Sequence, residues 1–174
     1  MIRPFAGISP RLGEGVFVAD TASVIGDVVI GVRSSIWYGT VLRADVEKIR
    51  VGSETSIQDN TVIHVDSSGF STEVGDRVTV GHSVVLHGCR IANGALIGIG
   101  SIVLNGAEIG EQAMIGAGSL VTPGTKIPPG VLALGSPARV KRPLTDEEKR
   151  HVQLGVANYI HLCAEHIRIS GRER

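Results

Sequence analysis

Large aliphatic residues recur at every sixth position along most of this chain, and this period limits what it can fold into. From position 91 onward the period is unbroken, at Ile91, Ile97, Val103, Ile109, Ile115, Val121 and Ile127. Four positions after each stands a smaller residue, at Ala95, Ser101, Ala107, Ala113, Ser119, Thr125 and Val131. An α-helix repeats near 3.6 residues and a simple strand at two, so a period of six fits neither. It indicates short strands joined by corners, with the large residue in a core and the smaller one where the chain turns.

The same period runs through the first part of the chain in shorter series. They are Val18, Val24, Ile30, Ile36 and Leu42; Val51, Ile57 and Ile63; and Val74, Val80 and Leu86. Between series the spacing gains three residues after Leu42, gains five after Ile63 and loses one after Leu86. Because the period returns after each slip, we interpret the slips as changes of loop length.

This pattern is the sequence signature of a parallel β-helix built from hexapeptides, with three units to each coil. We therefore predict an all-β domain over residues 1–140, in which eighteen units from Val18 to Ile127 form about six coils. A β-sandwich is the alternative for a chain with 23 glycines and 3% aromatic residues, but sandwich strands carry no six-residue period.

The pattern changes after Val140. Thr145 and Glu148, two and five positions after Pro143, have the spacing of a helix capping box. Apolar residues then follow at helical spacing, at Val152, Val156, Ile160, Cys163 and Ile167. We expect a C-terminal α-helix over about 146–167, within a segment 141–174 that packs on the β-helix or on a neighbouring subunit.

Composition excludes several classes of partner. Lys and Arg number 17 and Asp and Glu number 17, so the chain lacks the basic excess that nucleic acids and anionic membranes attract. No run of eighteen apolar residues or signal peptide is visible. The two cysteines, Cys89 and Cys163, do not form a disulfide framework. We expect a protein of the cytoplasm that binds neither membranes nor nucleic acids.

Three of the six histidines occupy related phases of the repeat. His64 follows a large aliphatic residue directly, and so does His87 one coil later, so the two should stack on one outer face with Arg43 one coil below. His82 stands on the next face round, above Asp59 in the coil before. The other three histidines, His151, His161 and His166, lie on the predicted helix and do not share one face.

The placement of these histidines suggests a metal shared between subunits. Two outward imidazoles on one face, His64 and His87, can bind one ion, whereas His82 points away from them and would come from a neighbouring chain. Three neutral imidazoles and an open position are the ligand set of a catalytic zinc ion. The alternative is that they are ordinary polar surface residues, but the shared register favours ligands.

The residues around these histidines resemble those of the γ-class carbonic anhydrase family over nearly the whole chain. The matching motifs are Leu42-Arg43-Ala44-Asp45, Ile57-Gln58-Asp59-Asn60, Ile63-His64-Val65, Gly81-His82, Leu86-His87-Gly88-Cys89 and Leu134-Gly135-Ser136-Pro137-Ala138-Arg139-Val140. The hexapeptide repeat alone is unspecific, because many acyltransferases share it. The Arg–Asp, Gln–Asp and three-histidine set is specific.

The resemblance implies a left-handed β-helix that forms a homotrimer, although the general crossover rule favours the right hand. It implies a metal at each subunit interface, Zn²⁺ or in some members Fe²⁺, on residues that match His64, His82 and His87. The family's roles for the remaining site residues carry over to matching positions. The match to Gln58 positions the hydroxide and carbon dioxide, those to Arg43 and Asp59 form a salt bridge between subunits, and that to Asp45 supports the site. Tyr159 resembles a helix tyrosine near the metal in some relatives, and packing of the helix is its other reading.

The activity implied is the reversible hydration of carbon dioxide to bicarbonate by metal-bound hydroxide, the reaction of a zinc lyase. The chain differs from an archaeal relative at Val46, where that enzyme has an acid that accepts the proton. Three other functions stay open at this point. They are a metal-dependent thioesterase or other hydrolase acting on acyl-CoA, a non-catalytic assembly protein of the same family, and a hexapeptide acyltransferase without metal.

Overall fold

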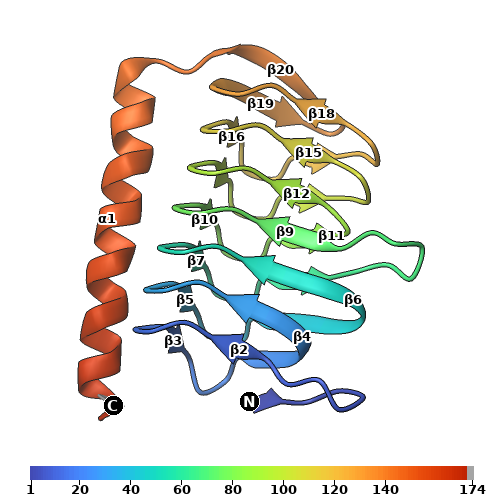
Figure 1. Ribbon diagram of the computed structural model, residues 1–174. Helices are drawn as coiled ribbons and strands as arrows, with labels where there is room; N and C mark the ends of the chain where they lie inside the picture. The colour runs from blue at the N-terminus through green and yellow to red at the C-terminus, as the bar shows by residue number, and fades with distance from the viewer. Residues whose placement is uncertain (172–174) are drawn as a thin grey trace.

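The six-residue period folds into a stack of triangular coils whose short strands build three sides (Figure 1). This computed structural model describes residues 1–171. Successive coils pair as parallel strands in register, for example Val80 with Ile97. Residues at the same phase of the repeat therefore form columns along the stack. We name the sides in chain order the first, second and third face.

The strands of each face come from successive coils. The first face holds β3 (Phe17–Val18), β5 (Ser35–Ile36), β7 (Ser56–Ile57), β10 (Thr79–Val80), β13 (Leu96–Ile97), β16 (Met114–Ile115) and β19 (Val131–Gly135). The second face holds β1 (Ile2–Arg3), the first parts of β4 (Ser23–Ile30) and β6 (Val41–Val51), β8 (Val62–His64), β11 (Val85–His87), β14 (Ile102–Val103) and β17 (Leu120–Val121). The third face holds β2 (Arg11–Leu12), the later parts of β4 and β6, β9 (Thr72–Val74), β12 (Arg90–Ile91), β15 (Glu108–Ile109) and β18 (Lys126–Ile127).

The large aliphatic residues of the repeat fill the interior, as predicted. Completely buried examples are Ile36, Leu42, Ile57, Ile63, Leu86, Ile97 and Ile115. The smaller residues at the corners are buried as well, among them Ala95, Ser101 and Ala107. Burying one Ile or Leu side chain stabilises a fold by about 1.5–3 kcal/mol, so the repeat provides the apolar core that holds the coils together.

The coils are left-handed, as the family resemblance implied and against the general crossover rule. In Figure 1 the front strands β4, β6 and β9 run from right to left while the chain climbs and returns behind them. Within residues 1–171 the first face has eight strands, and β20 (Ala138–Pro143) is its antiparallel member. The remaining parallel strands correspond to about seven turns rather than six, because β19 and the segment before Val18 extend the stack.

All three departures from the six-residue period fall at one corner, between the second and third faces. The extra residues after Leu42 lie inside β6, which runs around this corner without a break. The extra residues after Ile63 form the loop from Asp66 to Ser71, which leads into β9. The shortened spacing after Leu86 joins β11 to β12. The irregular corner therefore lies directly after the strand ends that carry His64 and His87.

The outer surfaces of the three faces differ in chemistry. On the first face Ser35, Ser56 and Thr79 are buried beneath the helix. The third face carries a column of alternating charge, formed by Arg50, Glu73, Arg90, Glu108 and Lys126. The second face carries a column of aliphatic residues, formed by Val41, Val62, Val85, Ile102 and Leu120. Val62 and Ile102 in this column are 39% and 38% exposed, so apolar side chains face outward there.

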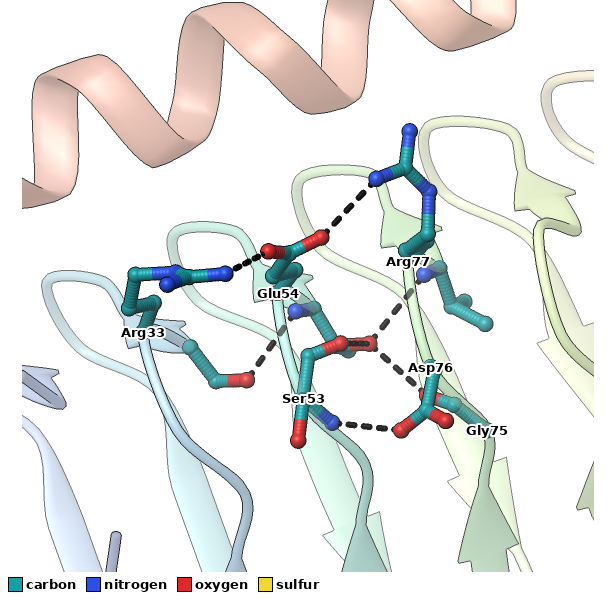
Figure 2. Close-up of polar contacts among 9 residues, drawn as sticks. Arg33, Ser53, Glu54, Gly75, Asp76 and Arg77 are labelled. Atoms are coloured by element: carbon teal, nitrogen blue, oxygen red, sulfur yellow. Dashed lines mark hydrogen bonds and ion pairs between the residues drawn. The ribbon is translucent and has the colours of Figure 1, made fainter. Parts of the chain in front are cut away.

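A ladder of charges fastens coils at the corner between the third and first faces. Glu54 accepts hydrogen bonds from Arg33 of the coil below and from Arg77 of the coil above, the latter at 2.9 Å (Figure 2). The bond from Arg33 is the main reason why the pKa of Glu54 lies below its usual value. The Asp76 carboxylate also accepts the backbone N–H of Ser53, at 2.7 Å. Exposed pairs of this kind contribute little stability each, so the buried core rather than this ladder holds the coils together.

The C-terminal helix α1 spans Asp146–Ile169, close to the predicted 146–167. Its capping box is present, since the Thr145 side chain accepts from the N–H of Glu148 and the Glu148 side chain accepts from that of Thr145. The helix lies along the first face of its own chain, against β3, β5, β7 and β10 (Figure 1). It buries Val152, Val156 and Cys163 there.

Strand β20 crosses the predicted boundary at residues 140 and 141, and residues 172–174 of the predicted segment lie outside the described residues. Cys89 and Cys163 are free and buried, as expected of a chain without a disulfide framework. Within residues 1–171 no helix has the length and apolar character needed to cross a membrane.

The repeat predicts a large penalty for truncating a core position. Ile97→Ala should lower the free energy of unfolding by about 2–5 kcal/mol, because Ile97 is fully buried and its removal leaves a cavity. Ile169→Ala is the matched control, since Ile169 is 73% exposed and should change stability little. Urea denaturation followed by circular dichroism measures both, and equal penalties would contradict this description of the core.

Candidate metal centre

His64 and His87 form a close pair at the ends of β8 and β11. The two residues are paired in register, as the sequence predicted. Nδ1 of His64 lies 3.1 Å from Nε2 of His87, and the ring centroids are 5.1 Å apart. The two nitrogens therefore face each other at the edge of the second face. Both side chains are partly buried there.

Asp45 accepts a hydrogen bond from the ring nitrogen of His64 that points away from His87. Nε2 of His64 lies 3.0 Å from Oδ1 of Asp45, and Arg43 forms an ion pair with the same carboxylate. Burial opposes the charged form of Asp45, but hydrogen bonds from His64 and Arg43 outweigh it and keep the pKa of this carboxyl below its usual value. A carboxylate only accepts hydrogen bonds, so Nε2 of His64 is the donor. In a neutral imidazole the lone pair is then on Nδ1, which faces His87.

Asn105 contacts the ring nitrogen of His87 that points away from His64. Nδ1 of His87 lies 2.6 Å from Oδ1 of Asn105, whose Nδ2 lies 3.0 Å from Oδ2 of Asp66. Because the Asp66 carboxylate only accepts, it fixes the amide with its NH₂ toward Asp66 and its oxygen toward His87. Nδ1 of His87 is therefore the donor, and the lone pair is on Nε2.

The two facing nitrogens thus fit two ligands of a metal ion. Two lone pairs 3.1 Å apart are an unfavourable contact unless a proton or a metal ion is shared between them. Two nitrogen ligands of a tetrahedral zinc ion stand about 3.3 Å apart at the usual zinc–nitrogen distance. Nowhere in residues 1–171 do three His, Cys, Asp or Glu side chains gather closely enough to bind an ion. One chain therefore brings together two of the three predicted ligands.

His82 lies at the other end of the second face, in the corner between β10 and β11. Its Nδ1 is 2.9 Å from Oδ2 of Asp59, which stands one coil below, as the sequence predicted. With Nδ1 directed at Asp59 in an ion-pair contact, Nε2 is the ring nitrogen that a metal could bind. The His82 side chain is 42% exposed, so the imidazole is accessible to a group outside the chain.

Gln58 and Tyr159 belong to the same end of the face as His82. Gln58 precedes Asp59 and is 6% exposed. The Tyr159 ring on α1 packs edge-on against Trp37, with centroids 5.6 Å apart. Burial, and secondly the negative charge of Asp59, raise the pKa of Tyr159. The packing role expected for Tyr159 is therefore present.

The predicted site residues thus form two groups at opposite ends of the second face. The His64 cluster comprises Arg43, Asp45, His64 and His87, and the His82 cluster comprises Gln58, Asp59, His82 and Tyr159. Within the chain Arg43 pairs with Asp45, and Asp59 pairs with His82. The salt bridge between Arg43 and Asp59 of different subunits stays a prediction.

Sequence reasoning did not find the part played by Asn105 and Asp66. One signal was present, because Asn105 comes two positions after Val103, which pairs with Leu86 next to His87. Asp66 begins a loop that follows no period, so its return toward Asn105 could not be read from spacing.

The chain is similar to a family model and to several known proteins. Residues 88–123 match the family model described as bacterial transferase hexapeptide (six repeats). Gamma carbonic anhydrase 2, mitochondrial, from Arabidopsis thaliana is 50% identical over 163 residues, which is 91% of this chain. The chain spans 59% of the length of that relative.

Two further proteins match over most of their own length. A Methanocaldococcus jannaschii protein that carries the name "Probable carbonic anhydrase" is 51% identical over 151 residues, covering 87% of this chain and 94% of its own. The crystal structure of a hexapeptide transferase family protein from Anaplasma phagocytophilum superposes with a TM-score of 0.90 at 47% identity, covering 94% of this chain and 96% of its own. Together with the left-handed coils and the two histidine clusters, these similarities show that the chain belongs to the γ-carbonic anhydrase family.

Proposed function

We propose that this protein is a carbonic anhydrase, which converts carbon dioxide and water reversibly to bicarbonate and a proton. The observation that carries the proposal is the 3.1 Å contact between Nδ1 of His64 and Nε2 of His87, in a chain whose relatives carry the name carbonic anhydrase. The fold itself does not discriminate, because a protein described as a hexapeptide transferase shares it.

The ion we propose is zinc, with iron(II) as the alternative, bound by His64 and His87 of one subunit and His82 of the next. Each of these imidazoles has one nitrogen held by a partner in its own chain, at Asp45, Asn105 and Asp59. Each therefore has the other nitrogen free as a ligand. Three such ligands leave one position of a tetrahedral ion open to water.

The surface of the second face supports a homotrimer. Its aliphatic column is covered by nothing within residues 1–171, whereas α1 covers the first face and charges cover the third. A ring with an axis parallel to the stack places one end of a second face against the opposite end of the next. That contact would bring the His64 cluster of one subunit to the His82 cluster of its neighbour and bury the aliphatic column.

The residues of the chain would then divide the work of the reaction. A bound zinc ion would lower the pKa of a water molecule so that it can attack carbon dioxide near neutral pH. Asp45 would hold His64 in the tautomer that binds a metal, and Asp59 would direct Nε2 of His82 toward the ion. Gln58 would offer its amide to the water and the carbon dioxide, and Arg43 would pair with Asp59 across the interface. Tyr159 would border the site from the helix.

We expect the protein to act in the cytoplasm, although a relative carries the name of a mitochondrial protein. We expect neither nucleic acid nor membrane among its partners, since the charges of the chain balance.

His82→Ala should remove the metal without unfolding the repeat, because His82 lies on an exposed corner. Protein purified without oxygen should contain about one metal ion per chain by elemental analysis, and the variant almost none. Hydration of carbon dioxide by the variant should fall to the uncatalysed rate in a stopped-flow pH assay. His151→Ala on the exposed side of α1 is the matched control.

Two results would contradict the proposal. One is a His82→Ala variant that still holds one ion per chain. The other is a metal-loaded wild type that hydrolyses acyl-CoA thioesters but does not hydrate carbon dioxide.

Mixing two inactive variants should restore part of the metal binding. His64→Ala and His82→Ala damage different clusters, so an interface between one subunit of each kind can have all three histidines intact. Random assembly of equal amounts places an intact pair at about one quarter of the interfaces. Elemental analysis after joint refolding measures the recovery.

The control for mixing uses two variants of the same cluster. His64→Ala with His87→Ala should restore nothing, because every subunit then lacks one of the two ligands from its side. Equal recovery in both mixtures, or none in either, would contradict a site shared between subunits.

A further inference from the structure

A chain of hydrogen bonds runs from the loop after β8 to His87. Oδ2 of Asp66 accepts from Nδ2 of Asn105, and Oδ1 of Asn105 accepts from Nδ1 of His87, at 3.0 Å and 2.6 Å. We propose that Asn105 and Asp66 are positioning residues, which fix the tautomer and direction of the His87 ring so that Nε2 is presented to a metal. This inference rests on the proposed function, because it gives the metal its reason.

Asp66 is held so that it can orient the amide. Its Oδ1 accepts the backbone N–H of Ser68 at 2.8 Å, and its own N–H donates to the carbonyl of Phe70 at 3.0 Å. An aspartate side chain is ordinarily a carboxylate at neutral pH. A carboxylate offers no donor, and Asn105 can therefore present only its oxygen to His87.

Gly88 leaves the space that Asn105 needs. A Cβ on Gly88 would stand 2.9 Å from Oδ1 of Asn105 and 2.7 Å from Cβ of Phe70, and the residue has a φ of +59°. Thr72 ties the same region to the other ligand, because its hydroxyl accepts from the N–H of Gly88 and donates to the carbonyl of His64. The loop, the glycine and both histidines are therefore one connected unit.

Under this proposal the loop from Asp66 to Ser71 positions a metal ligand. His64 reaches a carboxylate directly at Asp45, whereas His87 reaches one through an intervening amide. Partners that hold the second nitrogen of a ligand histidine set its tautomer, and their loss weakens metal binding by about 10–100-fold. A bond that only fastened the loop would not affect which nitrogen of His87 carries the proton.

The first test compares Asn105→Leu with Asn93→Leu. Asn93 also accepts a hydrogen bond through its Oδ1 at a corner, but the donor is the backbone N–H of Asp76, at 2.9 Å, rather than a histidine ring. We expect Asn105→Leu to weaken zinc binding by about 10–100-fold in competition with a chelator, and Asn93→Leu to leave it unchanged. Equal zinc affinities for the two variants would overturn the inference.

The second test exchanges the two polar groups. Asn105→Asp alone places a carboxylate against Asp66 and should weaken zinc binding, since like charges then face each other. Asp66→Asn with Asn105→Asp restores a donor at 66 and an acceptor at 105, and position 66 can still accept from Ser68. The double variant should recover most of the affinity lost by Asn105→Asp. Failure to recover would count against a hydrogen-bonded relay.

A third measurement separates this inference from the proposed function. Nitrogen-15 NMR of metal-free protein reports which ring nitrogen of His87 carries the proton. We expect Nδ1–H in the wild type and in the double exchange, and a mixture of tautomers in Asn105→Leu. An unchanged tautomer in Asn105→Leu would overturn the inference. If the wild type bound no zinc, the proposed function would be wrong while this comparison still decided what positions His87.

Discussion

The in-register stacking of successive coils is the constraint on which the rest of the molecule depends. Ile63 lies above Leu42 and below Leu86, and the same pairing continues along the stack. Since every coil repeats the path of the one before, a residue's phase decides its column. The histidine pair, the aliphatic column and the alternating charges are all consequences of this one rule. Burial of the aliphatic residues supplies the free energy that stabilises this in-register stack.

Much of this arrangement could be predicted from the sequence because phase carries spatial information in a repeat. The stacking of His64 with His87, and of His82 above Asp59, follows from counting residues to the nearest core position. The helix was predictable for a different reason, since its capping box is a local motif. In each case the information lies within one coil or one helical turn.

Other features could not be predicted because phase does not determine them. A period of six is the same for either hand, so the left-handed sense came from the family resemblance alone. The surface on which α1 packs depends on a choice between its own chain and a neighbour, and the structure places it on its own first face. The contact between Asn105 and Asp66 depends on the path of a loop that has no period.

The division of the site residues into two clusters has a physical consequence. Each histidine already has one nitrogen in contact with a partner of its own chain, at Asp45, Asn105 or Asp59. Under the proposed function, an ion that bridges the clusters binds only the associated subunits. Metal binding and assembly would then stabilise each other by mass action, because a ligand favours the state that binds it.

The irregular corner shows how a uniform repeat can build a specific site. The three added residues after Leu42 lie in the segment that carries Asp45, and the five after Ile63 carry Asp66. The residue lost after Leu86 goes with Gly88, whose missing side chain admits Asn105. Every departure from the period therefore provides a partner, or room for a partner, to one of the paired histidines. The regular units build a scaffold that could serve many chemistries, whereas the departures from the repeat orient His64 and His87.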